Sequence, residues 1–321
     1  MSVLVYMENW DGIFKKLSFE LVSYASEVAK MINTSVTALS IGKVEGPELL
    51  KLGSYGAKKI LTMENDLLGK LDSQAYSDVI SEVAQKTGAS VIILSNNNTG
   101  KAIAPRLSVR LKAGVGSGVS RLPLSIDPFT VYKRTFSGSA FAHIVIRSGI
   151  KILTLAQNTF SLIETENNAS VEKIDIPVES SVVRTKVQDV QRQTGKILLT
   201  DADIVVSGGR GMKSPDNWTP LVELAEALGA ALACSRPVSD EGWRPHEEHT
   251  GQTGKIIAPN LYIAVGISGA TQHLAGISSS KYIVAINTDK DAPIFEAAQY
   301  GIVGDAMKVL PKLVTALKNS K

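Results

Sequence analysis

The sequence predicts an α/β fold with two domains, each built on a mostly parallel sheet with flanking helices. Apolar runs of strand length alternate with segments whose apolar residues recur at helical spacing. Such alternation is typical of parallel strands covered by helices on both faces. The length of 321 residues suggests two domains, and the polar stretch 161–194 lies between two alternating regions. We therefore expect domains at residues 1–195 and 196–321.

The first domain is expected to begin with four strands, each followed by a helix. Pro47 suits the first turn of a helix, and Gly88 suits the end of one. The predicted strands are residues 3–7, 36–41, 59–63 and 91–95, and the predicted helices are residues 14–31, a short one from Pro47, 73–87 and 102–111. After Gly114 the pattern changes to antiparallel strands, predicted at residues 129–136 and 140–146 with a turn at Ser137-Gly138-Ser139, and at 151–155.

The second domain returns to alternating strands and helices. Leu221, Leu224, Ala225 and Leu228 form one apolar stripe, and Gly229 is a natural helix end. The predicted strands are residues 204–207, 231–234, 261–265, 282–286 and 302–303, and the predicted helices are residues 218–228, one after 268–270, 293–299 and 306–318.

The composition excludes several classes of protein. Hydrophobic residues make up 44% and charged residues 20%, as in ordinary soluble domains. The net charge of +3 is small and the basic residues are dispersed, which does not favour nucleic-acid binding. No apolar run reaches the roughly eighteen residues of a membrane span, and residues 1–8 suggest a strand rather than a signal peptide. Cys234 is the single cysteine, so no intrachain disulfide forms and a reducing, cytoplasmic location is expected.

Small or polar residues follow five strands of the second domain. In open parallel sheets, ligands bind at the carboxyl ends of strands. The five strand ends carry Ser207-Gly208-Gly209-Arg210, Ser235-Arg236, Gly266-Ile267-Ser268-Gly269, Asn287 and Gly304-Asp305. Because helices separate them, the sheet gathers them along one edge, and we expect one binding cleft there.

Individual features of that edge allow more than one interpretation. Ser268-Gly269-Ala270 suits an anion at a helix start, with Gly269 leaving room for a close approach, but a plain glycine turn is equally compatible. Arg236 follows a buried strand and needs a partner, which is either a ligand or a carboxylate. The histidines and glutamates of residues 246–249 lack metal-ligand spacing, so no metal site is predicted. Cys234 is interpreted as an inert buried thiol.

Several ordered motifs of the second domain resemble one known family. They run from residues 203–211 through Gly251-Gln252-Thr253-Gly254-Lys255, residues 261–270 and 272–276, Ala285-Ile286-Asn287 and residues 291–295 to residues 301–305. This series resembles the C-terminal domain of electron transfer flavoprotein alpha subunits, whereas the first 195 residues match that family in layout more than in motif. The resemblance implies that the second domain is a doubly wound FAD-binding domain.

The resemblance also implies roles for individual residues. Arg210 lies over the flavin ring, Ser235 and Arg236 hold the flavin region, and residues Thr250, Gly251, Gln252 and Thr253 line the cofactor. Ser268, Gly269, Ala270, Thr271 and Gln272 cradle the ribityl and pyrophosphate portion, His273 lies near a flavin carbonyl, and Asn287, Asp305 and Ala306 bind the adenosine end. Arg236, Thr253 and His273 are the residues implied to tune the flavin, and no metal is implied.

The implied activity is that of an electron carrier rather than an enzyme. It moves electrons through FAD, by way of the flavin semiquinone, from flavin dehydrogenases such as those acting on acyl-CoA to a respiratory, quinone-linked oxidoreductase. The implied partner is a beta subunit, against which the first domain packs. Thr250 and Thr271 depart from the family's usual aliphatic residues, which leaves the redox potential and partner preference open. The alternative is an NAD- or nucleotide-binding α/β enzyme, or a subunit without redox chemistry.

Overall fold

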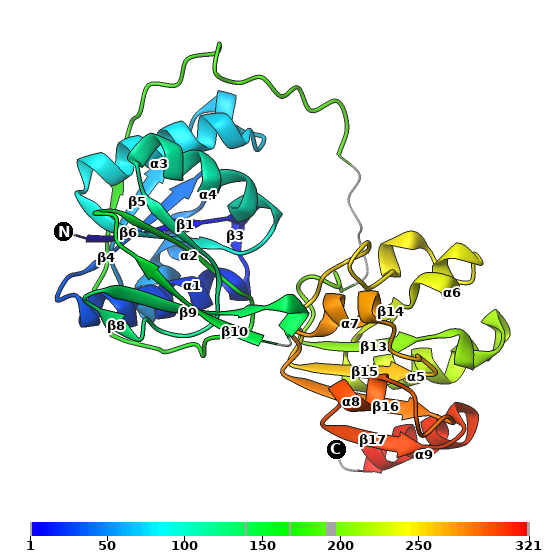
Figure 1. The fold of residues 1–321 in the computed structure, drawn as a ribbon. Coiled ribbons are helices and arrows are strands. Elements are labelled where there is room, and N and C mark those ends of the chain that lie inside the picture. The colour runs from blue at the N-terminus through cyan, green and yellow to red at the C-terminus, as the bar shows by residue number, and fades with distance from the viewer. Residues whose placement is uncertain (1, 139, 167, 191–196, 320–321) are drawn as a thin grey trace. The chain divides into compact units, whose positions relative to one another are not determined.

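The computed structural model describes residues 2–138, 140–166, 168–190 and 197–319. The chain divides into two compact units, one within residues 1–135 and 140–190 and the other within residues 136–139 and 191–321. Each unit has its own sheet and its own helices (Figure 1). The expected domain boundary between residues 195 and 196 lies outside the described residues. No helix in the described part of the chain is long and apolar enough to cross a membrane.

The first unit is built on one large, mainly parallel sheet. The strand order is β10-β9-β7-β11-β6-β1-β4-β5-β12, with β8 paired to β9. These strands are β1 Ser2–Met7, β4 Val36–Ile41, β5 Ala57–Met63, β6 Ala89–Ser95, β7 Gly114–Val119, β8 Ser125–Ile126, β9 Phe129–Thr135, β10 Ala140–Ile146, β11 Lys151–Leu155 and β12 Ser170–Lys173. The pairings from β7 to β12 are parallel, whereas β9 pairs antiparallel with β7, β8 and β10.

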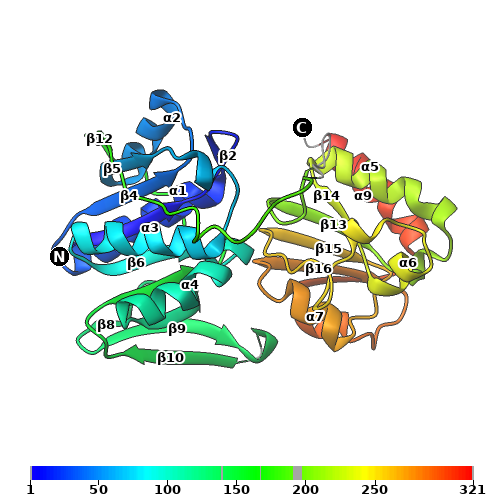
Figure 2. The ribbon, with the colours of Figure 1, turned by 90° about the horizontal axis from the view of Figure 1, so that it is seen from above.

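Helices cover both faces of this sheet. Alternate residues of β1 belong to two different cores, with Val3 and Val5 on one face and Leu4 and Tyr6 on the other. Helix α1 (Lys16–Met31) packs in the first core, and α3 (Ser73–Lys86) and α4 (Asn98–Leu111) pack side by side in the second (Figure 2). A short α2 (Gly46–Lys51) contains Pro47 near its start. The continuous apolar runs of the central strands follow from this two-sided burial.

The predicted elements of the first unit differ from the structure at a few positions. Helix α1 begins at Lys16 rather than residue 14, because Ile13–Phe14 (β3) pairs with Asn9–Trp10 (β2) in a hairpin. Helix α4 begins at Asn98, because the side chain of Asn97 accepts from the Gly100 N–H and caps it there. Strand β9 ends at Thr135, and Phe136 lies in the following turn with φ +48°. Ser139, the last residue of the predicted turn, lies outside the described residues. The expectation that residues 151–155 are antiparallel was wrong, because β11 lies between β6 and β7 and pairs parallel with both. Strands β7, β8 and β12 were not predicted.

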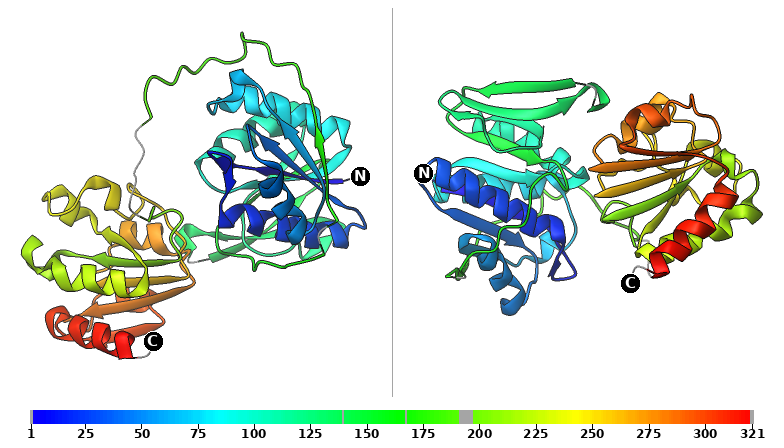
Figure 3. Two further views of the ribbon diagram at one scale, coloured as in Figure 1. Left: turned by 180° about the vertical axis from the view of Figure 1, so that it is seen from behind. Right: turned by 90° about the horizontal axis from the view of Figure 1, so that it is seen from below.

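The second unit is a five-stranded parallel sheet in the order β14-β13-β15-β16-β17. Its strands are β13 Ile204–Gly208, β14 Ala231–Cys234, β15 Leu261–Val265, β16 Tyr282–Asn287 and β17 Tyr300–Val303. Helices α5 (Thr219–Leu228) and α9 (Ala306–Asn319) pack on one face, and α7 (Thr271–Ile277) and α8 (Ile294–Ala297) pack on the other (Figure 3). Helix α8 is shorter than the predicted 293–299. The doubly wound α/β prediction is confirmed.

The strand order of the second unit contains a topological switch point. From β13 the chain moves to β14 on one side, and it then returns to form β15 on the other side of β13. The connections after β13 and β15 therefore leave the sheet toward opposite faces, which opens a crevice between their carboxyl ends. This is the place in the fold where a ligand is most expected.

Candidate functional site

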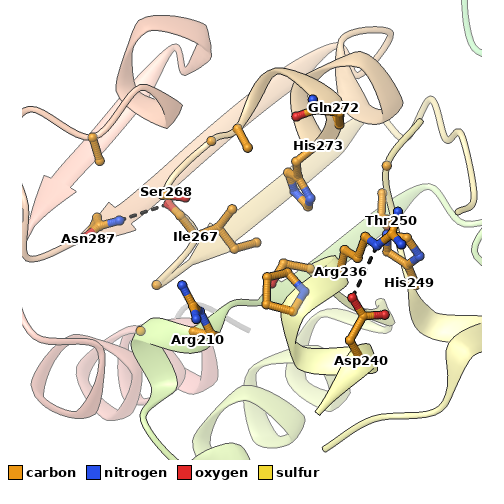
Figure 4. Close-up of a pocket in the computed structure, with 18 of the residues that line it drawn as sticks. Arg210, Arg236, Asp240, His249, Thr250, Ile267, Ser268, Gln272, His273 and Asn287 are labelled. Atoms are coloured by element: carbon orange, nitrogen blue, oxygen red, sulfur yellow. Dashed lines mark hydrogen bonds and ion pairs between the residues drawn. The ribbon is translucent and has the colours of Figure 1, made fainter. Parts of the chain in front are cut away.

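A pocket of about 550 Å³ lies at the carboxyl ends of β13 and β15, at the switch point. Figure 4 shows side chains from several loops converging on it. Among the predicted site residues, those that line the pocket are Arg210, Ser235, Arg236, Thr250, Gly251, Gln252, Thr253, Ser268, Gly269, Ala270, Gln272, His273 and Asn287. The structure thus brings together residues that are spread over 78 positions of sequence, from 210 to 287.

Three predicted site residues do not line this pocket. Thr271 is the first residue of α7 and is exposed. The carboxylate of Asp305 accepts from the Met307 N–H at 2.9 Å at the start of α9. Ala306 is buried in the core between α9 and the sheet. In the structure Asp305 and Ala306 contribute to helix α9, and Thr271 is exposed on α7. Their expected contacts with the cofactor stay predictions.

The floor of the pocket is made by two glycine-containing loops in backbone contact. The Gly211 N–H donates to the Gly266 carbonyl at 3.0 Å, and a Cβ on Gly211 would stand 2.6 Å from the Gly266 Cα. Gly266 itself has φ +61°, a conformation that other residues rarely adopt. Side chains at these positions would force the loops after β13 and β15 apart and change the crevice.

The sequence suggested that Gly269 leaves room for a ligand, but the structure gives another reason for a glycine at this position. Its φ is +89°, and a Cβ there would lie 2.4 Å from the backbone nitrogen of Ile294. The missing side chain therefore admits the start of α8, which hydrogen-bonds back through the Ile294 N–H to the Ser268 carbonyl at 3.0 Å. Close packing of the protein's own backbone accounts for this glycine without a ligand.

Arg236 is the first residue of α6 (Arg236–Asp240) and projects into the pocket. Its Nε lies 3.3 Å from Oδ2 of Asp240, and its Nη1 donates to the Thr253 hydroxyl at 3.3 Å. The arginine and aspartate side chains are both more than half exposed, so this ion pair adds little stability. A guanidinium has five N–H donors in a planar fork, and these two contacts engage two of them. Arg236 therefore pairs with a carboxylate, as one of its two interpretations expected, and it also lines the pocket, where its contact with a ligand stays a prediction.

The second cation of the pocket is Arg210. It opens the turn after β13 and lies 3.9 Å from a Glu241 carboxylate oxygen. Because it comes from β13 and Arg236 comes from the end of β14, the two cations reach the pocket from neighbouring strands. Positive charge at this edge favours an anionic ligand.

The loop of residues 249–255 is fixed to α7. The Gln252 N–H donates to the Gln272 carbonyl at 2.8 Å, and the Gly251 N–H donates to the Lys255 carbonyl at 3.2 Å. These bonds place Thr250 and His249 beside His273 on the wall of the pocket (Figure 4). The position of the Gly-Gln-Thr-Gly motif is thus set by backbone bonds to a helix that follows it in sequence.

Several buried polar atoms at this wall have no hydrogen-bond partner among the described residues. Within the described residues they include Nδ1 of His249, Oγ1 of Thr250 and Nδ1 of His273, and all three residues line the pocket. Buried polar groups in native proteins are nearly always hydrogen-bonded. Three such atoms beside one cavity indicate that the wall is shaped for a polar ligand.

Burial keeps both histidines of the wall neutral. It lowers the pKa of His273 to about 4, with a further lowering by the charge of His249 and an opposing effect of the Thr250 backbone. Burial also lowers the pKa of His249, and His246 and Arg236 lower it further, against Asp240. The positive charge of the pocket at neutral pH therefore belongs to arginine, and the histidines act as hydrogen-bonding groups. Burial raises the pKa of Cys234 to about 12, in line with an inert thiol.

The sequence interpretation missed several pocket residues. They are Pro237, Asp240, His249, Asp289 and Ala292. Asp240 could have been found from its spacing, because it lies four residues after Arg236 on a helix. Asp289 and Ala292 had no such signal, since they come from an irregular loop after β16 whose path only the fold reveals.

Comparison with known proteins agrees with this geometry. Residues 3–179 match the family described as electron transfer flavoprotein domain, and residues 198–278 match the electron transfer flavoprotein FAD-binding domain. The electron transfer flavoprotein subunit alpha of Bacillus subtilis is 36% identical over 320 residues, covering 99% of this chain and 97% of the relative. That of Syntrophomonas wolfei is 35% identical over 317 residues and covers 98% of each chain. The protein FixB of Escherichia coli is 35% identical over 301 residues, covering 93% of this chain and 94% of the relative.

Both halves of the chain and nearly the full length of these relatives are included in the matches. The pocket lined by the predicted residues lies in the unit that the FAD-binding domain match covers. The chain belongs to the electron transfer flavoprotein alpha-subunit family.

Proposed function

We propose that this chain holds FAD in the pocket between β13 and β15 and carries electrons between other proteins. The observation that supports this most is the convergence of arginine cations and unsatisfied buried polar atoms at a topological switch point. Dinucleotides bind at such points in doubly wound sheets. The family supplies the identity of the dinucleotide, because residues 198–278 match an FAD-binding domain.

The lining of the pocket fits the parts of FAD. Arg236 and Arg210 offer positive charge to an anion, and Pro237 and Ile267 offer apolar surface to a ring. In the described part of the chain, Nδ1 of His249 and Oγ1 of Thr250 have no hydrogen-bond partner, and cofactor atoms would supply one. A volume of about 550 Å³ lies in the range of sites for organic ligands.

We assign the two ends of the cofactor from the strand ends. Residues after β14 and in the Gly-Gln-Thr-Gly loop hold the flavin ring, with Arg210 over it, and Ser268 to Gln272 hold the ribityl and pyrophosphate portion. Asn287, with Asp305 and Ala306 at the next strand end, holds the adenosine. The Asn287 amide donates to the Ile267 carbonyl at 2.9 Å, and its Oδ1 accepts from the Asp289 N–H at 3.0 Å, so both ends of the amide are held in place.

Bound FAD supplies the redox chemistry, because its ring accepts and releases electrons singly or in pairs. Arg236 places a positive charge where negative charge increases on reduction, so it favours the reduced state. Asp240 opposes that effect from one helical turn away, at 3.3 Å from the guanidinium. Thr253 holds the guanidinium in place from the other side, and His273 provides a neutral hydrogen-bonding edge. These residues together set how readily electrons are accepted.

The partners follow from the family rather than from a surface of the chain. We propose a heterodimer with a beta subunit, against which the first domain, residues 1–195, packs. Electrons would come from flavin dehydrogenases such as acyl-CoA dehydrogenases and would pass to a quinone-linked oxidoreductase. The single cysteine of the sequence accords with a cytoplasmic location.

Co-expression with the beta subunit tests this function. We expect the purified heterodimer to be yellow, with one FAD that is lost when Ala270→Trp fills the pocket. Ala270 lines the pocket and is exposed, so the larger side chain does not disturb a core. The matched control is Ala316→Trp on the exposed face of α9, which should retain the FAD. A heterodimer that takes up no FAD, or one whose FAD survives Ala270→Trp, contradicts the proposal.

A further inference from the structure

Behind the pocket wall, a buried tyrosine hydrogen-bonds to the buried histidine that faces the pocket. Tyr262 is the second residue of β15, paired on one side with Val205 and on the other with Ile283. Its side chain is fully buried on the face covered by α7 and α8, and it is not one of the residues that line the pocket. Its hydroxyl lies 2.8 Å from Nε2 of His273. A buried phenol needs such a partner.

The phenol keeps its proton. Burial raises the pKa of Tyr262 far above its ordinary value, against an opposing effect of the Ser207 hydroxyl. The imidazole of His273 is neutral as well, because burial lowers its pKa to about 4. One hydrogen therefore lies between Tyr262 and Nε2, and it comes either from the phenol or from the ring.

The environment of the second ring nitrogen decides between these two cases. Since Nε2 faces Tyr262, Nδ1 is the ring nitrogen beside Thr250, which lines the pocket together with His273, and the Thr250 backbone raises the pKa of His273 as a carbonyl acceptor does. A carbonyl oxygen has only lone pairs, so a bare Nδ1 facing it would be repelled. Among the described residues, Nδ1 has no partner within hydrogen-bonding geometry. Nδ1 therefore favours carrying the proton, and because its contact with the carbonyl falls short of a hydrogen bond, it can still donate that proton to a ligand.

We propose that Tyr262 is a positioning residue that donates its hydrogen to Nε2 of His273 and thereby holds the proton of the imidazole on Nδ1, facing the pocket. This inference rests on the proposed FAD function and deepens it, because it makes His273 a hydrogen-bond donor toward the cofactor. Without Tyr262, the ring has no fixed donor behind it and can carry its proton on Nε2 instead. His273 would then offer a lone pair, which repels a flavin carbonyl.

The charged and titratable neighbours of His273 do not supply the same control. His249, in the loop against α7, lowers the pKa of His273 when it is itself charged. At pH 7 its ring is neutral, because burial lowers its pKa. Arg236 lies across the pocket with Asp240 and Thr253 as its contacts. Tyr262 is the residue that touches Nε2 from inside the core, so the tautomer depends on it.

The test is ¹⁵N NMR of the full chain labelled at histidine and assembled with an unlabelled beta subunit. The chain has four histidines, and the signal of His273 is assigned by its loss in His273→Gln. In the native protein we expect Nδ1 protonated and Nε2 bare. Tyr262→Phe should move the proton toward Nε2 and raise the pH at which His273 titrates, because the hydrogen bond that favours the neutral ring is lost. Tyr282→Phe, an exposed tyrosine on the neighbouring strand, is the matched control and should change neither.

A native His273 protonated on Nε2, or a Tyr262→Phe variant with an unchanged tautomer, overturns the inference. If Tyr262→Phe does not fold, the tautomer of the native protein decides alone. The NMR signal is readable with or without flavin, and flavin content is measured separately by absorbance. Failure of the proposed function therefore appears as a colourless heterodimer, and failure of this inference appears as the wrong tautomer.

Discussion

Arg236 and Asp240 lie one turn apart on α6, with Nε of the arginine 3.3 Å from Oδ2 of the aspartate, and both side chains line the same pocket. The cation that favours negative charge in the pocket is thus accompanied by a carboxylate that opposes it. These two charges act on a bound ligand in opposite directions, and each is open to a separate test.

Arg236→Ala is expected to lower the reduction potential of bound FAD. Removal of the positive charge destabilises the reduced, more negative cofactor, and a loss of at least about tenfold in the one-electron equilibrium is a reasonable size for one charge in a partly desolvated site. Potentiometric titration of the heterodimer measures this shift. Arg236→Lys keeps the charge but loses the planar fork, so its reduction potential should lie between those of the native protein and Arg236→Ala. A potential unchanged in Arg236→Ala would remove the arginine from the redox role.

Asp240→Asn is expected to raise the same potential. The substitution keeps the size of the side chain and removes a negative charge next to Arg236, so the guanidinium acts on the cofactor with less opposition. Because Asp240 is exposed, water screens its charge and the change should be smaller than that of Arg236→Ala. The matched control is Glu226→Gln on the exposed face of α5. A potential that falls in Asp240→Asn contradicts the assignment of its effect.

Gly211→Ala is expected to destabilise the second unit and release FAD. The new Cβ would stand 2.6 Å from the Gly266 Cα, and only a shift of backbone relieves that contact. Overpacking of this kind costs about 1–3 kcal/mol. Chemical denaturation and flavin content measure the two effects. Gly149→Ala, which meets nothing within 4 Å, should leave both unchanged. A Gly211→Ala protein with native stability and full flavin would show that the floor of the pocket tolerates separation of the loops.

Asp72→Ala is expected to destabilise the first unit by about 1–2 kcal/mol at neutral pH through loss of a helix cap. The Asp72 carboxylate accepts from the N–H groups of Gln74 and Ala75 at the start of α3, and from those of Arg184 and Thr185 in the segment after β12. Burial acts to raise the pKa of Asp72, but these hydrogen bonds prevail and hold it at about 2.

The pH dependence follows from that lowered pKa. The carboxylate of Asp72 stabilises the fold fully above about pH 3.9, the pKa of an aspartate in the unfolded chain. This contribution is lost as the pH falls through about 2, the pKa of Asp72 in the folded protein. Unfolding by urea should therefore separate the native and Asp72→Ala proteins at pH 7 and bring them together toward pH 2. Asp66→Ala, at an exposed aspartate nearby, is the control. A difference independent of pH would assign the effect to something other than the carboxylate.

The sequence predicted best the strands that have a regular pattern of burial. β4, β11, β14 and β15 have the predicted bounds, since continuous apolar runs mark strands between two layers of helices, and β10, in which exposure alternates, has them as well. β7 was missed because Gly114, Gly116 and Gly118 interrupt its apolar pattern. β12 was missed because all four of its residues are exposed, and it joins β5 through backbone pairing and the exposed Lys59–Glu172 ion pair. Backbone pairing at a sheet edge leaves no hydrophobic signal.

The residues of the candidate site were also predictable only in part. Residues directly after a strand, such as Arg210, Ser235 and Ser268, could be placed because parallel strands end at one edge. The Tyr262–His273 hydrogen bond joins the interior of one strand to the following helix, and nothing in the local pattern of either residue predicts it. Gly269 was correctly placed at the pocket, but a glycine is needed there because α8 packs against it, and only the three-dimensional structure reveals that contact.

The most direct test of the whole account is a crystal structure of the yellow heterodimer. We expect electron density for FAD in the crevice between β13 and β15, with the flavin ring within hydrogen-bonding distance of Arg236 and the Gly-Gln-Thr-Gly loop, and with the pyrophosphate beside Ser268. Density for FAD at another place in the assembly, with Arg236 turned away from it, would contradict the account.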